Sequence, residues 1–230
     1  DAYKNMVMES LMKQIGMKEL PVHIECFDNS NIQGTNPVSA CVVFRNAVPS
    51  KKDYRHFKVK TVVGANDYAT MKEVVNRRYS RMMEENPEDL PQLVVIDGGK
   101  GQLAFAYEAL AELGLTDKLT VIALAERMEE VYRVGDPYPM FIDRNSPALK
   151  VLQQIRDEAH RFGITFHRKL RSKTQIESAL HSIKGVGAKT EQRLLLRFGS
   201  VARIAAAPVE EIAELVGQQL AERIKQSLSS

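Results

Sequence analysis

Two aspartates close apolar runs in this sequence. Asp28 ends the run VHIECFD, which begins at Val22, and Asp97 ends the run LVVID, which begins at Leu93. An ionised carboxylate is costly inside a sheet unless it has a partner, so both are expected at the carboxyl ends of strands, where open α/β sheets bind ligands. On neighbouring strands the two carboxylates would repel each other, and a divalent cation such as Mg²⁺ or Mn²⁺ would relieve the repulsion. Alternatively, each aspartate caps a turn or the following helix.

The residues after Asp97 form a glycine-rich turn, GGKG, in front of an apolar helical pattern. Glycine lets a backbone approach a phosphate closely, and a helix N-terminus favours an anion. Lys100 adds a cation to the same turn. The spacing, and the absence of the required Ser or Thr, exclude a Walker phosphate-binding loop. The turn therefore indicates a phosphate-containing ligand beside Asp97.

Two further polar residues are candidates for the same site. His160 lies in RDEAHRFGITFHR, on the helix expected after the last strand, where it could bind a metal or relay a proton. A single helical histidine is more often a surface or core residue. Asp67 opens the helix that begins in GANDYATM. It either caps that helix or adds another carboxylate near a metal.

Positive charge is concentrated in one stretch of the chain. Between Arg156 and Arg197 there are ten basic and four acidic residues, whereas the residues before this stretch carry a net negative charge. A local basic stretch is typical of a protein that binds a polyanion. The candidate nucleic-acid contacts outside the hairpin described next are Lys100, Arg156, Arg161, Arg168 and Lys169.

The segment IKGVGAKT, which begins at Ile183, is typical of a helix-hairpin-helix. Its two glycines predict a tight turn whose backbone N–H groups bind a DNA phosphate without reading sequence. The candidate contacts are Lys184, Gly185, Gly187, Lys189 and Arg193. An ordinary turn between two helices is the alternative. A second, shortened hairpin is expected at 215–218, where Gly217 either forms a turn that binds phosphate poorly or only caps a helix.

The periodicity of apolar residues predicts the order of elements. After a helix at 6–15 come three strands (22–28, 38–45 and 54–63), a helix (67–85), a strand (93–96), a helix (99–114) and a strand (119–125). The last helix of this part begins at Pro147 and runs to about Gly163, or on toward Arg171. The two prolines within 132–141 predict an irregular segment. Short helices follow from Ile176 onward. The order predicts an α/β fold with a mixed sheet and flanking helices, plus a small all-α domain.

The composition excludes several classes of protein. No apolar run reaches the roughly 20 residues that a membrane-spanning helix needs. Cys26 and Cys41 lack the spacing of a zinc site and are expected to be buried thiols, which fits a reducing cytoplasm. The first residues lack the layout of a signal peptide. Because there is no initiator Met, we expect the chain to be a fragment of a longer protein.

Four blocks of sequence resemble, in order and spacing, the conserved blocks of UvrC, the nuclease subunit of bacterial nucleotide excision repair. They are CFDNSNIQG, GANDYATM, LVVIDGGKGQL and RDEAHRFGITFHR. The resemblance implies an RNase H-like domain in which Asp28, Asp97 and His160 form the metal-binding catalytic triad and Asp67 is a further acidic residue. The family usually has an aliphatic residue where this chain has Asn29, a difference that removes no ligand.

The same resemblance implies a function and a set of partners. The expected activity is the 5′ incision of damaged or bubble DNA with Mg²⁺ or Mn²⁺, in the cytoplasm and together with UvrA and UvrB. The expected domains are an RNase H-like endonuclease (1–162), a basic linker (163–175) and a tandem helix-hairpin-helix domain (176–230). The family's domain for 3′ incision and its usual UvrB-binding segment are not recognisable in this chain.

Two other functions are compatible with the same residues. One is a non-catalytic DNA-binding module that uses the sheet as a scaffold, and the other is a nuclease of the same fold that resolves DNA junctions. The presence of Asp28, Asp97 and His160 argues against the first. Cleavage of a four-way junction, compared with that of a damaged duplex, would distinguish the second.

Overall fold

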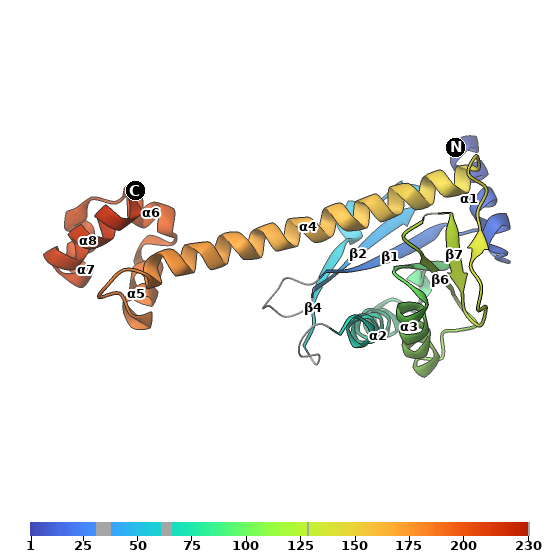
Figure 1. Cartoon of the computed structure of the whole chain (residues 1–230), viewed down its shortest axis with the longest axis horizontal. Coiled ribbons are helices and arrows are strands. Elements are labelled where there is room, and N and C mark those ends of the chain that lie inside the picture. Colours follow the sequence, from blue (N-terminus) through green and yellow to red (C-terminus); the bar gives the residue numbers. More distant parts are fainter. Residues whose placement is uncertain (31–37, 61–65, 128, 230) are drawn as a thin grey trace. The chain divides into compact units, whose positions relative to one another are not determined.

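The computed structural model describes residues 1–30, 38–60, 66–127 and 129–229, without the side chains of residues 30, 67 and 166–178 (Figure 1). The chain forms two compact units, Asp1–Phe166 and His167–Ser230. The first unit contains the sheet, and the second is helical. No helix in the described ranges is long and apolar enough to cross a bilayer.

The first unit is built on one mixed sheet of eight strands. In chain order they are β1 (His23–Ser30), β2 (Val38–Arg45), β3 (Val48–Pro49), β4 (Arg55–Lys58), β5 (Leu93–Asp97), β6 (Thr120–Leu124), β7 (Glu130–Arg133) and β8 (Met140–Phe141). The spatial order is β3-β2-β1-β5-β6-β7-β8, and β4 also pairs with β2. The central strands β1, β5 and β6 run parallel, and the outer pairs are antiparallel.

Helices cover both faces of this sheet (Figure 1). On one face, α1 (Ala2–Ile15) and the first turns of α4 (Pro147–His181) pack their apolar stripes against β1 and β5; Leu11 and Leu152 are fully buried there. On the other face, α2 (Asp67–Glu85) and α3 (Lys100–Glu112) bury Met71, Tyr79 and Leu110. Because both faces are covered, β5 is a continuous apolar run that ends at Asp97, as expected for a central parallel strand.

Most elements of the first unit lie where the sequence predicts them. β2 and α2 have the predicted bounds, and β1, β2 and β4 form the predicted antiparallel set. The third strand is shorter than predicted, since β4 covers only Arg55–Lys58; residues 61–63 of that prediction lie outside the described residues.

The prediction that 132–141 is irregular holds for 134–139 but was wrong at both ends of the segment. The segment contributes to an antiparallel hairpin of β7 and β8, in which Val131 pairs with Met140. Pro137 and Pro139 lie in the connecting loop, where their missing N–H groups interrupt no ladder hydrogen bond. The two prolines therefore shorten the strands without preventing them from pairing.

The helix α4 is longer than the sequence predicts, because it continues through Gly163 to His181. Gly163 costs a helix only about 1 kcal/mol relative to Ala, and the next residues contain no proline. The backbone of the predicted linker, 163–175, is thus helical. The predicted domain limits themselves stay predictions.

The second unit is a small helical domain. Beyond α4 it contains α5 (Ala188–Phe198), α6 (Val201–Ala206), α7 (Val209–Val216) and α8 (Gln218–Leu228), close to the predicted bounds. Its core includes Leu194, Ile204, Ile212 and Ile224. Gly187 precedes α5 and Gly217 precedes α8, so each predicted hairpin places a glycine at the start of a helix.

Candidate active site

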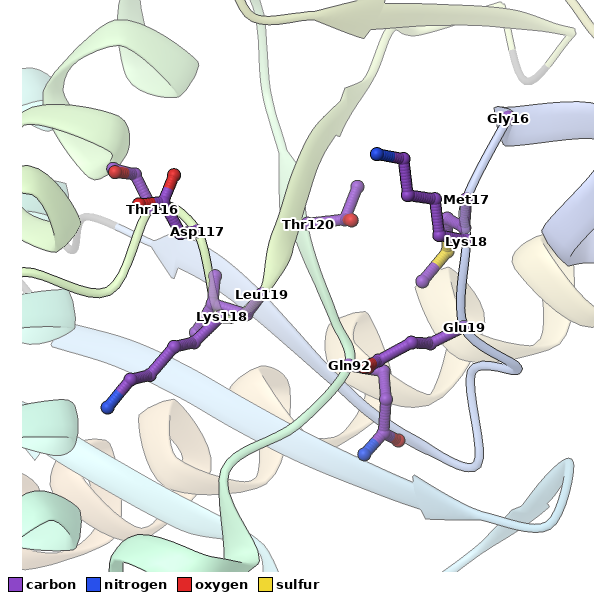
Figure 2. A pocket seen from close by; sticks show the side chains of 10 residues that line it. All are labelled: Gly16, Met17, Lys18, Glu19, Gln92, Thr116, Asp117, Lys118, Leu119 and Thr120. Atoms are coloured by element: carbon purple, nitrogen blue, oxygen red, sulfur yellow. The ribbon is translucent and has the colours of Figure 1, made fainter.

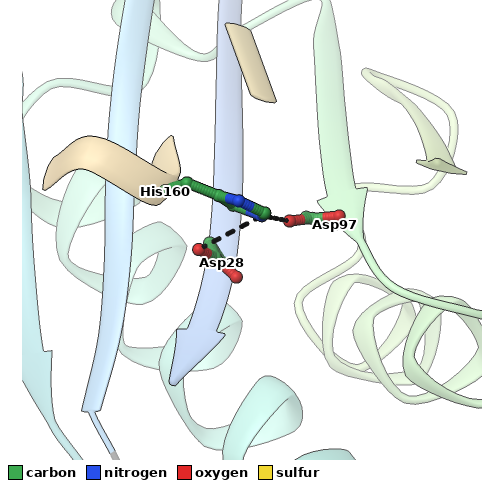
Figure 3. A group of neighbouring side chains, drawn as sticks. All are labelled: Asp28, Asp97 and His160. Atoms are coloured by element: carbon green, nitrogen blue, oxygen red, sulfur yellow. Dashed lines mark hydrogen bonds and ion pairs between the residues drawn. The ribbon is translucent and has the colours of Figure 1, made fainter. Parts of the chain in front are cut away.

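The two aspartates meet at the carboxyl edge of the sheet. β1 and β5 are parallel neighbours, and their register places Asp28 directly beside Asp97. His160 reaches the pair from α4, with its ring between the two carboxylates (Figure 3). Its Nε2 lies 2.5 Å from Asp97 Oδ2 and 3.7 Å from Asp28 Oδ2. One ligand atom from each of the three residues lies within 4.8 Å of the others.

Burial and mutual repulsion affect the charge of this group. The side chains of Asp28 and Asp97 are 15% and 7% exposed. Burial, and then the negative charge of Asp97, raise the pKa of Asp28 to about 6, although His160 and Arg156 act in the opposite direction. A carboxyl group with so high a pKa is expected where a cation would otherwise balance the charge.

The donor set fits a divalent cation. Two carboxylates and one imidazole converge on one point, and carboxylate oxygens are the donors that Mg²⁺ and Mn²⁺ prefer. The imidazole ring faces solvent on its other side, since His160 is 49% exposed. An ion in this position would therefore be reachable by a ligand from outside.

Arg156 holds Asp97 from the other side. It lies one helical turn before His160 on α4, and its Nε is 3.2 Å from Asp97 Oδ1. Its Nη1 donates to the carbonyl oxygens of Ala125 and Glu126, just beyond β6. The contacts of Arg156 position Asp97 against the end of β6, and the predicted contact of Arg156 with DNA stays a prediction. Sequence spacing did not reveal this role, because it depends on a partner far away in the chain.

The glycine-rich turn after Asp97 is filled largely by the protein itself. A Cβ on Gly98 would collide with the side chain of Gln102, whose Oε1 accepts a hydrogen bond from Gly99 N–H at 2.6 Å. A Cβ on Gly101 would collide with the ring of Tyr68. At Gly99 the surrounding space is open. Close internal packing thus accounts for two of the three glycines, and the predicted approach of this turn to a phosphate stays a prediction.

The other cations predicted near this edge also have internal partners. Lys100 Nζ donates to Pro137 O and lies 5.3 Å from the centre of the Tyr132 ring. Arg161 pairs with Glu158, which also accepts a hydrogen bond from Tyr54 at 2.7 Å. The side chains of Arg168 and Lys169 lie outside the described residues.

Asp67 does not cap α2, which was one of the two roles predicted for it. The N-cap is Asn66, whose side chain accepts a hydrogen bond from Ala69 N–H, and Asp67 is the first helical residue. The side chain of Asp67 is not among the described ones, so its proximity to a metal stays a prediction.

In the helical unit, each hairpin is held by an arginine of the other. Arg193 of α5 donates to Leu215 O at 3.1 Å, and Arg223 of α8 donates to Lys184 O at 2.6 Å. Gly185 has φ +99°, a conformation that favours glycine, as the predicted turn requires. The contact of Arg193 joins the two hairpins, and its predicted binding to DNA stays a prediction.

A cavity of about 530 Å³ lies away from the acidic group (Figure 2). Its lining includes Gln92, just before β5, and Thr120, the first residue of β6, so it opens at the amino ends of these strands. Asp97 stands at the opposite end of β5. The cavity therefore belongs to a different edge of the sheet from the candidate active site.

The fold and site define a class of protein: an α/β domain with an acidic metal-type site at its sheet edge, joined to a helical domain with two glycine hairpins. The family model described as the UvrC RNase H endonuclease domain matches residues 12–164. A second model, a SAM-like helix-hairpin-helix tandem, matches residues 177–230. The chain belongs to the UvrC family, and the predicted resemblance and fold class are confirmed.

Most of this chain is similar to part of longer bacterial proteins. The chain is 54% identical over 222 residues to the UvrABC system protein C of Porphyromonas gingivalis, and 53% identical over 224 residues to that of Flavobacterium johnsoniae. The matches cover 96% and 97% of this chain but only 37% of each relative. Endonuclease V of Ciona intestinalis in complex with a 24mer DNA is 13% identical, with a TM-score of 0.42; the match covers 74% of this chain and 96% of that one. That likeness is too distant to bear on function.

Proposed function

We propose that this chain is a metal-dependent DNA endonuclease that makes the 5′ incision of nucleotide excision repair. The observation that carries the proposal is the convergence of Asp28, Asp97 and His160 within 4.8 Å at one sheet edge. Membership of the UvrC RNase H endonuclease family supports the same reaction class. The substrate is a DNA phosphodiester in a damaged or locally unpaired duplex.

The three side chains divide the work of hydrolysis. Asp28 and Asp97 hold the Mg²⁺ or Mn²⁺ ion, which supplies positive charge that offsets the charge developing on the phosphate. His160 completes the ligand set, or orients and deprotonates the attacking water through its Nε2. Arg156 keeps Asp97 in place. Asp67 adds a further acidic group at the start of α2.

The second unit binds DNA backbone without reading its sequence. The N–H groups at the starts of α5 and α8 face the phosphates, and Lys184 and Lys189 add charge. UvrA and UvrB are the proposed partners, because the relatives are named as components of the UvrABC system. The proposed location is the cytoplasm.

Nicking of an end-labelled duplex tests the proposed function. A bubble or lesion-containing duplex is incubated with the chain and Mn²⁺, and the product is sized at single-nucleotide resolution. We expect one cut on the 5′ side of the lesion, abolished by a chelator. Retention of DNA without any cut would instead support a non-catalytic module, and preferred cutting of a four-way junction would support a junction-resolving nuclease.

Arg156→Met should lower the incision rate about 10- to 100-fold, the usual effect of losing a residue that orients a metal ligand. Met keeps the length of the side chain but removes the donors to Asp97, Ala125 and Glu126. Single-turnover nicking measures the effect. Lys150→Met, at an exposed position on the same helix, is the matched control. Equal rates for the two variants would contradict a positioning role for Arg156.

Mn²⁺ binding should weaken as the pH falls below 6. Burial and the charge of Asp97 raise the pKa of Asp28 to about 6, so below that pH an ion must displace a proton. One displaced proton weakens binding about tenfold per pH unit. Titration calorimetry at pH 5.0 and pH 7.5 measures the difference, and a constant Kd would contradict the assignment.

In the metal-free protein, the raised pKa of Asp28 also sets the direction in which stability changes with pH. The native carboxyl of Asp28 keeps its proton up to about pH 6, whereas the unfolded carboxyl loses it near 3.8. Between these two pKa values the native state therefore binds more protons than the unfolded state. As the pH rises through this window, the contribution of Asp28 to the free energy of unfolding falls by roughly 1–3 kcal/mol.

A further inference from the structure

Two aromatic side chains around the β7–β8 hairpin face solvent. Tyr138 is 76% exposed and Phe141 is 68% exposed, more than any other aromatic residue that the structure describes. An aromatic side chain has a large apolar surface, and burying it would normally stabilise the fold. Exposed aromatic surface of this kind often marks a contact with another molecule.

The backbone holds Tyr138 in a defined conformation. It lies between Pro137 and Pro139, whose rings restrict the chain on both sides. Its N–H donates to Asp136 Oδ1 at 3.1 Å, and Asp136 N–H donates to Arg133 O at 3.2 Å. Because the loop is already ordered, a ligand that stacks on Tyr138 loses little affinity to ordering entropy.

The loop lies beside the glycine-rich turn of the candidate active site. Lys100, the third residue after Asp97, donates through Nζ to Pro137 O, the residue before Tyr138. On the side of α2, Tyr68 packs against Gly101 and stacks on Phe105, with ring centres 5.4 Å apart. Figure 1 shows α3 between α2 and β7. Tyr68 is 48% exposed. Two exposed tyrosines, Tyr68 and Tyr138, therefore flank the turn that follows Asp97.

The cations near this turn already have partners within the protein. Lys100, Arg156 and Arg161 are each bonded to the protein itself. Stacking of a base on an aromatic ring needs no charge and tolerates any sequence, because every base has a π face. It requires that the base be unpaired, as it is in a bubble.

We propose that Tyr138, with Tyr68 on the other side of the turn, forms a stacking platform for unpaired nucleobases of the strand that enters the active site. The inference rests on the proposed function, and it adds a binding determinant for single-stranded character next to the site of incision. Tyr138 is the better residue to test, because Tyr68 also packs against Gly101 and Phe105.

Binding and nicking of a bubble duplex by the whole chain test this proposal. Tyr138→Ala should weaken binding at least about fivefold, whereas Tyr138→Phe, which keeps the ring, should stay within about twofold of the parent. Tyr3→Ala is the matched control, since Tyr3 is also exposed (63%) but lies on α1. Melting curves of all variants report whether the fold is intact.

A second experiment removes one base at a time from the unpaired strand and measures the affinity of each abasic substrate. A purely structural role for Tyr138 would not make the effect depend on the position of the missing base. The parent should lose affinity at the nucleotide that stacks, and Tyr138→Ala should be insensitive at that position alone. Equal losses for parent and variant at every abasic position would overturn the proposal, and so would a Phe variant as weak as Ala. If the parent protein binds the bubble duplex but never cuts it, the proposed nuclease activity is refuted. The binding measurements still test whether Tyr138 stacks on a base.

Discussion

Asp97→Asn should lower the rate of DNA incision by roughly a thousandfold or more, the equivalent of losing several kcal/mol of transition-state stabilisation by a held cation. Asn has nearly the shape of Asp but lacks its charge. It would disrupt the site at its centre, because Asp97 contacts His160 through Oδ2 and Arg156 through Oδ1. The neighbouring Asp28 cannot compensate, since one carboxylate and one imidazole hold a hard cation poorly.

The same substitution should leave the fold intact. Removing the charge of Asp97 ends its repulsion with Asp28, which offsets the weakened contact with Arg156. Single-turnover nicking and thermal unfolding, measured on the same preparation, separate the two effects. Asp157→Asn, which removes a charge at an exposed position of α4, is the control and should cut at close to the parent rate. If the Asp97→Asn variant retained a tenth of the parent rate, the proposed role of this carboxylate would be wrong.

Glu25→Ala should lower the free energy of unfolding by about 3–5 kcal/mol, because it leaves a buried cation without its partner. Glu25 is fully buried on β1. Its carboxylate accepts hydrogen bonds from Arg78 at 2.6 and 2.7 Å and from the Tyr79 hydroxyl at 2.8 Å, and it lies 2.7 Å from His23 Nε2. Burial by itself would raise the pKa of Glu25, but the hydrogen bonds and charges of Arg78 and His23 outweigh it and lower the pKa to about 2.

The direction of the pH dependence follows from that lowered pKa. The stabilisation by Glu25 is fully present above its unfolded pKa of 4.5 and is lost as the pH falls toward 2. Urea unfolding at pH 7 and pH 3 measures both effects. Glu85→Ala is the control, because the exposed pair of Glu85 with Arg81 is worth at most about 1 kcal/mol. Equal stability of the two Ala variants at pH 7 would show that the buried cluster does not stabilise the fold.

Local patterns were sufficient to predict most elements but not their partners. The run of strand-forming residues at 38–45 predicts β2, and the helical spacing of apolar residues at 67–85 predicts α2, both with their observed bounds. The same local view of VHIECFD treats Glu25 as one polar residue in an apolar strand, because its partner Arg78 is on α2. Local patterns also miss the strands at the ends of 132–141, because the pairing of β7 with β6 outweighs the effect of two nearby prolines.

The sequence alone determined the kinds of chemistry available to this protein: carboxylates near the ends of strands, a histidine on a late helix, and two glycine turns before helices. Short-range steric and hydrogen-bonding preferences act within a few residues, so they are visible in the order of the amino acids. The tertiary structure decided which of these groups meet. The parallel register of β1 and β5 places Asp28 beside Asp97, and the packing of α4 across the sheet brings in His160 and Arg156. Such contacts depend on apolar burial between distant segments, which no local pattern encodes.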